Sequence, residues 1–258
     1  MNTKLLEFKN KRDNVIRGIL VENSNQKHVA VMLGGFERAT STERKFKVLA
    51  DELAKNDIPS LRFDVADVGL SDGDFYQMTM QTIADDLLVV VENLKKLGFE
   101  KISFVGHSQA ACAVSLLLKG IDFEKIVLFA SALNQKELQR LWFVQEKNPL
   151  EKIGWNNYKE KLDEVEFQKT ISQDALTKSH LLKAQFKQTN SNFNYEENFE
   201  GYNLKKILVV QGNGDKVCPI ESLVIEFPNK ILVEGGDHDM EKPEMIKQWV
   251  GGVVKFLG

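Results

Sequence analysis

Residues 102–113, with the sequence ISFVGHSQAACA, contain the most informative pattern in the chain. An apolar run typical of a buried strand leads into GHSQA (106–110), and the small residues that follow favour a helix. A serine on such a sharp strand-to-helix turn has a strained backbone, and the residues two positions away on either side must be small because their Cβ atoms crowd the turn. Gly106 and Ala110 meet this requirement. The pattern therefore predicts that the Ser108 hydroxyl is exposed at the carboxyl end of a strand, as a candidate nucleophile.

Short apolar strands alternate with helical patterns on both sides of this turn. The predicted strands are 28–33, 60–63, 101–105, 125–130, 206–210 and 230–233, and the predicted helices are 42–55, 79–97, 109–119, 220–226 and 243–257. A hairpin over 4–9 and 14–21, closed by the polar turn 10–14, precedes them. This alternation indicates an α/β fold with a mostly parallel central sheet and helices on both faces.

The alternation stops between residues 134 and 203, where the chain is charged, carries several aromatic residues and is predicted to be helical. The simplest arrangement is one α/β core, residues 1–133 and 204–258, interrupted by a cap insertion, residues 134–203.

Composition excludes several classes of protein. The 34 Lys and Arg residues against 37 Asp and Glu give a net charge of −3, too balanced for a protein that binds mainly nucleic acid. Two cysteines without a Cys/His cluster predict neither a disulfide framework nor a metal site. The N-terminus lacks the apolar run of a secretory signal, and no run is long enough to span a membrane. We therefore expect a cytoplasmic protein, and its oligomeric state is left open.

A serine hydroxyl needs a histidine to take its proton before it becomes a good nucleophile. The chain has four histidines. His107 adjoins Ser108 and is expected to point away from it, whereas His238 lies in the loop after the last predicted strand. An elbow serine in an alternating sheet needs its base at that place, so His238 is the candidate base.

The carboxylate that orients the base is expected on a loop after an earlier strand, and Asp215 follows the strand 206–210. Asp237 and Asp239 are closer to His238 in sequence, but immediate neighbours seldom face the ring Nδ1, and both are equally interpretable as loop or capping residues. Asp215 is therefore the preferred acid. The resulting order, serine, acid, histidine, distinguishes one of the three common serine triads.

Taken together, these motifs resemble an α/β-hydrolase-fold serine hydrolase over nearly the whole chain. The matching segments are LGGF (33–36), LRFD (61–64) with GLSDG (69–73), the turn 106–110, and the loops of Asp215 and His238. The backbone N–H of Gln109 follows the nucleophile and is one expected oxyanion donor. The resemblance implies that the N–H of Phe36 is the second.

The expected chemistry is acyl transfer from a small-molecule ester to Ser108 and then to water, with no metal or organic cofactor. The GHSQ turn and the cap are similar to those of cinnamoyl and feruloyl esterases, so we expect carboxylic esters of small to medium acyl or aromatic acids. A thioesterase, a carbon–carbon bond hydrolase or an amidase or peptidase would use the same triad. A non-catalytic binding protein of this fold is a further alternative. Phe36, Trp142 and Trp155 are hypothetical borders of the acyl pocket.

Three other features are interpreted as structural. Asp64 and the loop 69–73 lack the Lys-Ser or Lys-Thr of a phosphate-binding loop. Cys112 and Cys218 are interpreted as packing residues rather than reactive thiols.

Overall fold

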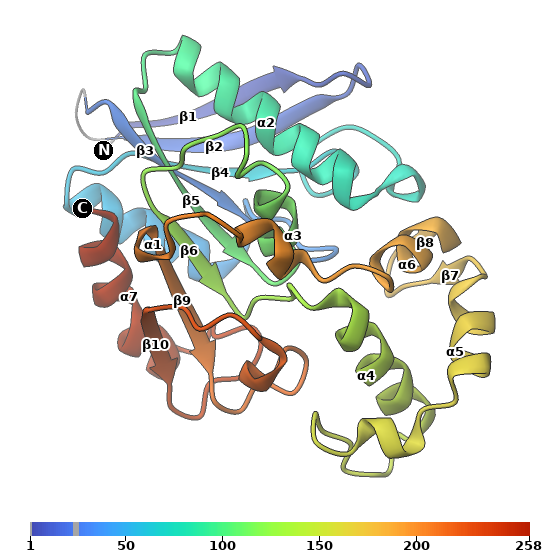
Figure 1. The fold of residues 1–258 in the computed structure, drawn as a ribbon. Coiled ribbons are helices and arrows are strands. Elements are labelled where there is room, and N and C mark those ends of the chain that lie inside the picture. The colour runs from blue at the N-terminus through green and yellow to red at the C-terminus, as the bar shows by residue number, and fades with distance from the viewer. Residues whose placement is uncertain (1, 23–25) are drawn as a thin grey trace.

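A single eight-stranded sheet forms the centre of the protein (Figure 1). The structure is a computed structural model and describes residues 2–22 and 26–258. The strand order is β1-β2-β4-β3-β5-β6-β9-β10, in which β1, β2 and β4 pair antiparallel and all other neighbours pair parallel. The strands are β1 (Asn2–Lys9), β2 (Val15–Glu22), β3 (His28–Leu33), β4 (Ser60–Asp64), β5 (Lys101–His107), β6 (Ile126–Phe129), β9 (Ile207–Gly212) and β10 (Asn229–Val233).

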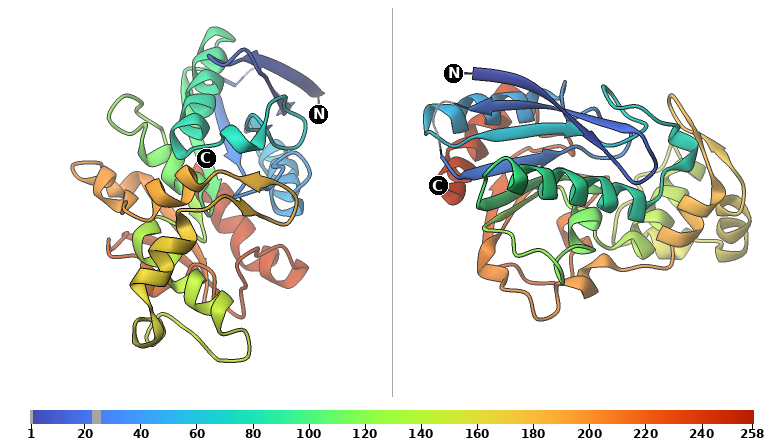
Figure 2. Two further views of the ribbon diagram at one scale, coloured as in Figure 1. Left: turned by 90° about the vertical axis from the view of Figure 1, so that its right-hand side faces the viewer. Right: turned by 90° about the horizontal axis from the view of Figure 1, so that it is seen from above.

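Helices cover both faces of this sheet, as the alternating sequence predicts (Figures 1 and 2). One core packs α2 and α3 against the sheet, and it contains Leu87 and Val31. The opposite core packs α1 and α7, and it contains Trp249 and Met32. Because successive side chains of β3 point to opposite faces, Val31 and Met32 enter different cores. The four helices are α1 (Arg44–Lys55), α2 (Met80–Lys96), α3 (Ala110–Ser115) and α7 (Pro243–Leu257).

Most of the segment 134–203 lies beyond the carboxyl ends of the parallel strands (Figures 1 and 2). Its last residues return beside α3, where Asn198 Nδ2 donates to Ser115 Oγ at 3.0 Å. A hydrophobic cluster within this segment contains Leu141, Tyr158 and Phe167, whereas Phe186 and Tyr195 join the main core. The segment is helical as predicted, and it also holds a small hairpin that the sequence did not indicate. Its elements are α4 (Gln135–Lys147), α5 (Glu164–Ile171), β7 (Ala175–Leu176), β8 (Leu181–Leu182) and α6 (Ala184–Asn190).

The predicted α/β fold is confirmed, but two helices were wrong in extent. The helix predicted over 109–119 ends at Ser115, and the chain continues in tighter turns with i→i+3 hydrogen bonds such as Leu117 N–H to Val114 O, 3.0 Å. The helix predicted over 220–226 is a single 3₁₀ turn, Ile220–Ser222.

A buried carboxylate explains why the second helix does not extend. Glu196, from the distant segment 134–203, is 3% exposed and accepts hydrogen bonds from the N–H groups of Val224 and Ile225 at 2.8 and 3.2 Å. These donors are the ones that a helix continuing from Ile220 would use for its own carbonyls.

Candidate active site

Ser108 sits on a strained turn between β5 and α3. Its φ is 55°, in the left-handed region that costs energy for any residue with a side chain. A Cβ on Gly106 would lie 2.5 Å from Phe104 Cε1 and 3.0 Å from Ala110 Cβ, so glycine is required there. The structure thus contains the strained turn that the sequence 102–113 predicts.

His238 and Asp215 form the hydrogen bond expected of a base and its orienting acid. His238 Nδ1 lies 2.9 Å from Asp215 Oδ2, and the Asp215 side chain is fully buried. Asp215 Oδ1 accepts the backbone N–H groups of Val217 and Cys218 at 2.8 and 2.9 Å, and Oδ2 accepts from Gln211 Nε2 at 3.2 Å. These three hydrogen bonds fix the direction of the carboxylate. Nε2 of His238 is left as the nitrogen that could exchange a proton with a nucleophile.

Glycines let the two loops that carry this pair approach each other closely. A Cβ on Gly212, at the end of β9, would lie 2.3 Å from Gly236 O, in the loop after β10. The N–H of Gly214 donates to the same carbonyl at 2.9 Å. Parallel β9 and β10 therefore deliver Asp215 and His238 to one point at their carboxyl ends.

The two aspartates nearest to His238 in sequence have other interaction partners. Asp237 accepts the N–H of Met240 at 2.9 Å and pairs with Lys242 at 3.0 Å. Asp239 pairs with Arg38 at 2.5 Å. Both interactions hold the loop, and neither carboxylate bonds to the imidazole.

His107, which sequence reasoning set aside, packs directly against His238. The two ring centroids are 4.7 Å apart, and His107 Nε2 lies 2.9 Å from the backbone oxygen of His238. Burial, and then the nearby Lys45 ammonium, hold the pKa of His107 well below its usual range, so the ring is neutral and donates Nε2–H to that oxygen. The only signal in the sequence was the position of His107 at the end of a strand, beside the nucleophile.

The two candidate oxyanion donors lie beside Ser108. A Cβ on Gly35 would be 3.1 Å from Ser108 Cβ, so the loop after β3 is in contact with the serine. Phe36, Gln109, Ser108 and His238 line the same cavity. Within residues 2–22 and 26–258, the N–H groups of Phe36 and Gln109 have no hydrogen-bond acceptor, which leaves both free to bind a negatively charged oxygen.

This cavity has a volume of about 400 Å³ and lies between the Ser108 turn and the helices α4, α5 and α6. Five aromatic side chains contribute to its walls, together with aliphatic, polar and charged residues. They are Phe36, Trp142, Phe143, Phe167 and Phe186. Trp155 was wrongly expected at its border. Trp155 instead packs against Tyr158 in a tilted arrangement, at 5.5 Å between ring centroids, at the edge of the cluster of the segment 134–203.

Helix α4 also contacts the loop of the candidate acid. Trp142 Nε1 donates to Val217 O at 2.7 Å, and Gln145 Nε2 donates to Lys216 O at 3.3 Å. The segment 134–203 therefore supports the position of Asp215 as well as lining the cavity.

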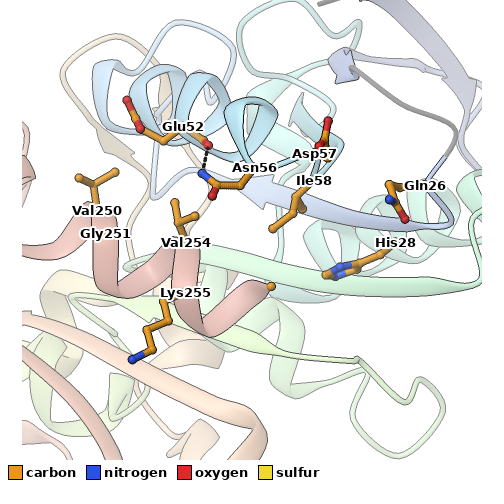
Figure 3. Close-up of a pocket in the computed structure, with 11 residues that line it drawn as sticks. Gln26, His28, Glu52, Asn56, Asp57, Ile58, Val250, Gly251, Val254 and Lys255 are labelled. Carbon is orange, nitrogen blue, oxygen red and sulfur yellow. Dashed lines mark hydrogen bonds between the residues drawn. The ribbon is translucent and has the colours of Figure 1, made fainter.

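A larger cavity, of about 680 Å³, lies at the opposite end of the sheet, between α1 and α7 (Figure 3). It is lined by His28 at the start of β3, by Asn56 and by Lys255, among others. His28 Nε2 bonds Ser103 Oγ at 2.8 Å, so its ring is engaged in the sheet. Ligands of open α/β sheets bind at the carboxyl ends of the strands, and the smaller cavity is the one at that end.

The features interpreted as structural have structural partners. Asp64 is buried and accepts hydrogen bonds from Ser41 N–H at 3.0 Å and from Leu70 N–H at 2.9 Å. Cys112 Sγ donates to Ala132 O at 3.1 Å, and burial raises the pKa of its thiol. Burial, and then the negative charge of Asp215, also raises the pKa of the Cys218 thiol. Both thiols are therefore held in the unreactive protonated form.

Residues 2–22 and 26–258 offer neither a metal-binding cluster nor a membrane-spanning helix. No group of three or more His, Cys, Asp or Glu side chains there could hold a metal ion. No helix among those residues has the length and apolar character needed to cross a membrane.

The sheet, the serine turn and the loops at its carboxyl edge define an α/β-hydrolase fold. A family model described as "Acyl transferase" matches residues 5–140, and the chain belongs to this acyl transferase family. An acyl transferase from Shewanella hanedai is 31% identical over 93 residues, which cover 36% of this chain and 30% of that protein. The match thus spans less than a third of that relative's length.

Solved structures agree on the fold. The esterase Est1E of Butyrivibrio proteoclasticus with bound ferulic acid has a TM-score of 0.77 at 22% identity, covering 98% of this chain and 97% of that one. An esterase of Pyrococcus furiosus has a TM-score of 0.69 at 18% identity, covering 99% and 90%. At such identities the likeness concerns the fold alone.

Proposed function

We propose that this protein is a serine hydrolase that cleaves carboxylic esters of small to medium acyl or aromatic acids. In this proposal Ser108 is the nucleophile, His238 the base and Asp215 the acid that orients it. The observation that carries the proposal is the 2.9 Å hydrogen bond between His238 and the buried Asp215 carboxylate. The same histidine lines one cavity together with Ser108 on its strained turn.

In the first half of the reaction, Ser108 Oγ forms a bond to the ester carbonyl carbon while its proton moves to His238 Nε2. Asp215 stabilises the imidazolium that results. The N–H groups of Phe36 and Gln109 stabilise the negative oxygen of the tetrahedral intermediate, and each such donor contributes about 3 kcal/mol to lowering the barrier in comparable enzymes. The carbon–oxygen bond to the alcohol then breaks, and the alcohol leaves with the proton from His238.

In the second half, water attacks the acyl-enzyme. His238 Nε2 accepts a proton from the water, the oxygen of water bonds to the acyl carbon, and the bond to Ser108 Oγ breaks as the proton returns to the serine. The carboxylic acid is released. Apart from the substrate and one water molecule, these steps use only side chains and backbone groups of the chain.

The proposed substrate class is inferred from the residues that line the cavity. Aromatic side chains from the core loop and from α4, α5 and α6 surround the space next to Ser108, and such walls favour apolar or aromatic acyl groups. We propose that residues 134–203 act as a cap over this space. Est1E, whose structure contains ferulic acid, supports an aromatic acid as one candidate acyl group.

A second candidate is transfer of the acyl group to an acceptor other than water, from an ester or a thioester. The family description and the Shewanella hanedai relative favour this alternative. The acyl-enzyme is common to both, so the distinction lies in the second half-reaction. Product analysis with ester and thioester donors, with and without added alcohols and thiols, separates hydrolysis from transfer.

The direct test is intact-protein mass spectrometry after treatment with a fluorophosphonate, together with turnover of 4-nitrophenyl acetate and butyrate. We expect one label per chain and turnover in the wild type, and neither in Ser108→Ala. Ser172→Ala, which alters an exposed serine at the end of α5, serves as the matched control and should label fully. A folded wild type that neither labels nor turns over ester would refute the proposal and favour a binding role.

A further inference from the structure

Lys187 places a positive charge in the wall of the cavity that contains Ser108. It lies on α6, next to Phe186, and lines the cavity together with the serine and His238. The side chain is partly buried, and this burial lowers the pKa of its ammonium group.

No counter-ion in the described part of the chain pairs with Lys187. Its electrostatic attraction to Glu146 and Asp174 acts without an ion pair within 4.0 Å. Arg38, the other cation that lines the cavity, is already paired with Asp239 at 2.5 Å. Glu146 lines the cavity from α4, but it is exposed to solvent. Lys187 is therefore the cavity-lining cation whose charge is available to a ligand.

An unpaired ammonium group beside apolar walls lacks part of its hydration and gains from an anionic partner. The flexible stem of lysine allows the charge to follow an anion over several positions in the cavity. Aromatic walls with one available cation fit a molecule that has an apolar body and a carboxylate.

We propose that Lys187 binds a carboxylate carried by the substrate, so that the preferred esters are anionic, with an apolar or aromatic body. This inference rests on the proposed function and narrows its substrate class. The carboxylate is either on the acyl part, as in a half-ester of a dicarboxylic acid, or on the leaving group, as in an ester of a hydroxybenzoic acid.

Two matched substrate pairs distinguish these positions. The first is mono-4-nitrophenyl glutarate against its methyl ester, and the second is 4-acetoxybenzoate against its methyl ester. The quantity measured is the ratio of kcat/KM for the charged member to that for the neutral member of each pair.

Lys187→Met is expected to lower this ratio about tenfold for one pair, because the charge-assisted contact is lost. Glu146→Gln is expected to raise the same ratio a few-fold, because it removes a negative charge from the cavity wall. Lys183→Met is the matched control, at the residue that precedes α6. Lys183 contacts the Tyr76 ring and lies outside the cavity. The ratio of kcat/KM for charged and neutral substrate in Lys183→Met should therefore equal that of the wild type.

A ratio that changes less than twofold in Lys187→Met for both pairs would overturn the inference, as would an equal fall in Lys183→Met. Calorimetric binding of monomethyl suberate and dimethyl suberate to Ser108→Ala tests the site without turnover. If Lys187→Met, added to Ser108→Ala, weakens the binding of monomethyl suberate about tenfold, the inference is supported. This holds even if the protein proves not to be a hydrolase. Equal binding with and without Lys187 refutes it while leaving the proposed function intact.

Discussion

Substitution of the buried Asp67 tests how the burial of a carboxylate changes the free energy of unfolding with pH. Its side chain is 1% exposed, and its nearest cation, Arg12, is 3.5 Å away and is shared with Asp86. Among the described residues, Asp67 Oδ1 has no hydrogen-bond partner. Burial, with a contribution from the negative charge of Asp86, raises the pKa of Asp67 from 3.8 to about 6.

The raised pKa means that the folded protein binds the proton of Asp67 more tightly than the unfolded chain. The stability contributed by this proton is fully present below pH 3.8 and is lost as pH rises through about 6. At about 1.4 kcal/mol for each pH unit, the loss is about 3 kcal/mol. Asn is uncharged, has nearly the same shape and tolerates the φ of 81° at this position. Asp67→Asn is therefore expected to be more stable than the wild type above pH 7 by up to about 3 kcal/mol.

The assay is urea unfolding of the wild type and Asp67→Asn at several pH values from 4 to 8. Distant carboxylates titrate alike in both proteins, so the difference between the two free energies of unfolding reports Asp67 together with its coupling to Asp86. Asp13→Asn is the control, because Asp13 also has a positive φ, 70°, but an exposed side chain. A difference between wild type and Asp67→Asn that stays constant from pH 4 to 8, or a variant less stable at pH 8, would refute the reasoning.

Three further predictions concern the candidate site. Asp215→Asn should lower kcat for 4-nitrophenyl butyrate about 10⁴-fold, because the amide favours the wrong imidazole tautomer, and activity within tenfold of the wild type would exclude Asp215 as the orienting acid. Gly212→Ala should lower the free energy of unfolding by about 1–3 kcal/mol, since its Cβ would lie 2.3 Å from Gly236 O, and unchanged urea unfolding would contradict this. Trp142→Phe removes the 2.7 Å hydrogen bond to Val217 O. It should reduce kcat several-fold and lower the free energy of unfolding by about 1 kcal/mol. A kcat equal to that of the wild type would show that this hydrogen bond does not support the loop of Asp215.

The sequence predicted the elements whose cause is local. Gly106 and Ala110 flank the turn at Ser108 because their Cβ positions crowd it, and this constraint is readable from the residues alone. The final helix was predicted with its bounds, because Pro243 suits a first helical turn and the apolar residues that follow repeat with helical spacing.

Features that depend on distant contacts were not predictable in this way. The helix expected over 220–226 is short because Glu196 binds its backbone N–H groups from another part of the chain. The contact of His107 with the His238 carbonyl and the absence of Trp155 from the cavity are likewise set by packing between distant segments. Asp215 was preferred over Asp237 and Asp239 because of its loop, and the structure brings Asp215 to the imidazole.

The position of β9 and β10 has a consequence for synthesis of the protein. Both strands follow the segment 134–203 in the chain: β9 pairs with β6, and β10 pairs with β9 at the edge of the sheet. The loops after them hold Asp215 and His238, and His238 lines the same cavity as Ser108. During synthesis the candidate nucleophile therefore leaves the ribosome before its candidate base, and domains generally complete their folding as units. In a chain that stops before the loop of His238, the candidate base is absent and cannot activate Ser108. Its hydroxyl then has the low reactivity of an ordinary serine, so unfinished chains are not expected to attack cellular esters.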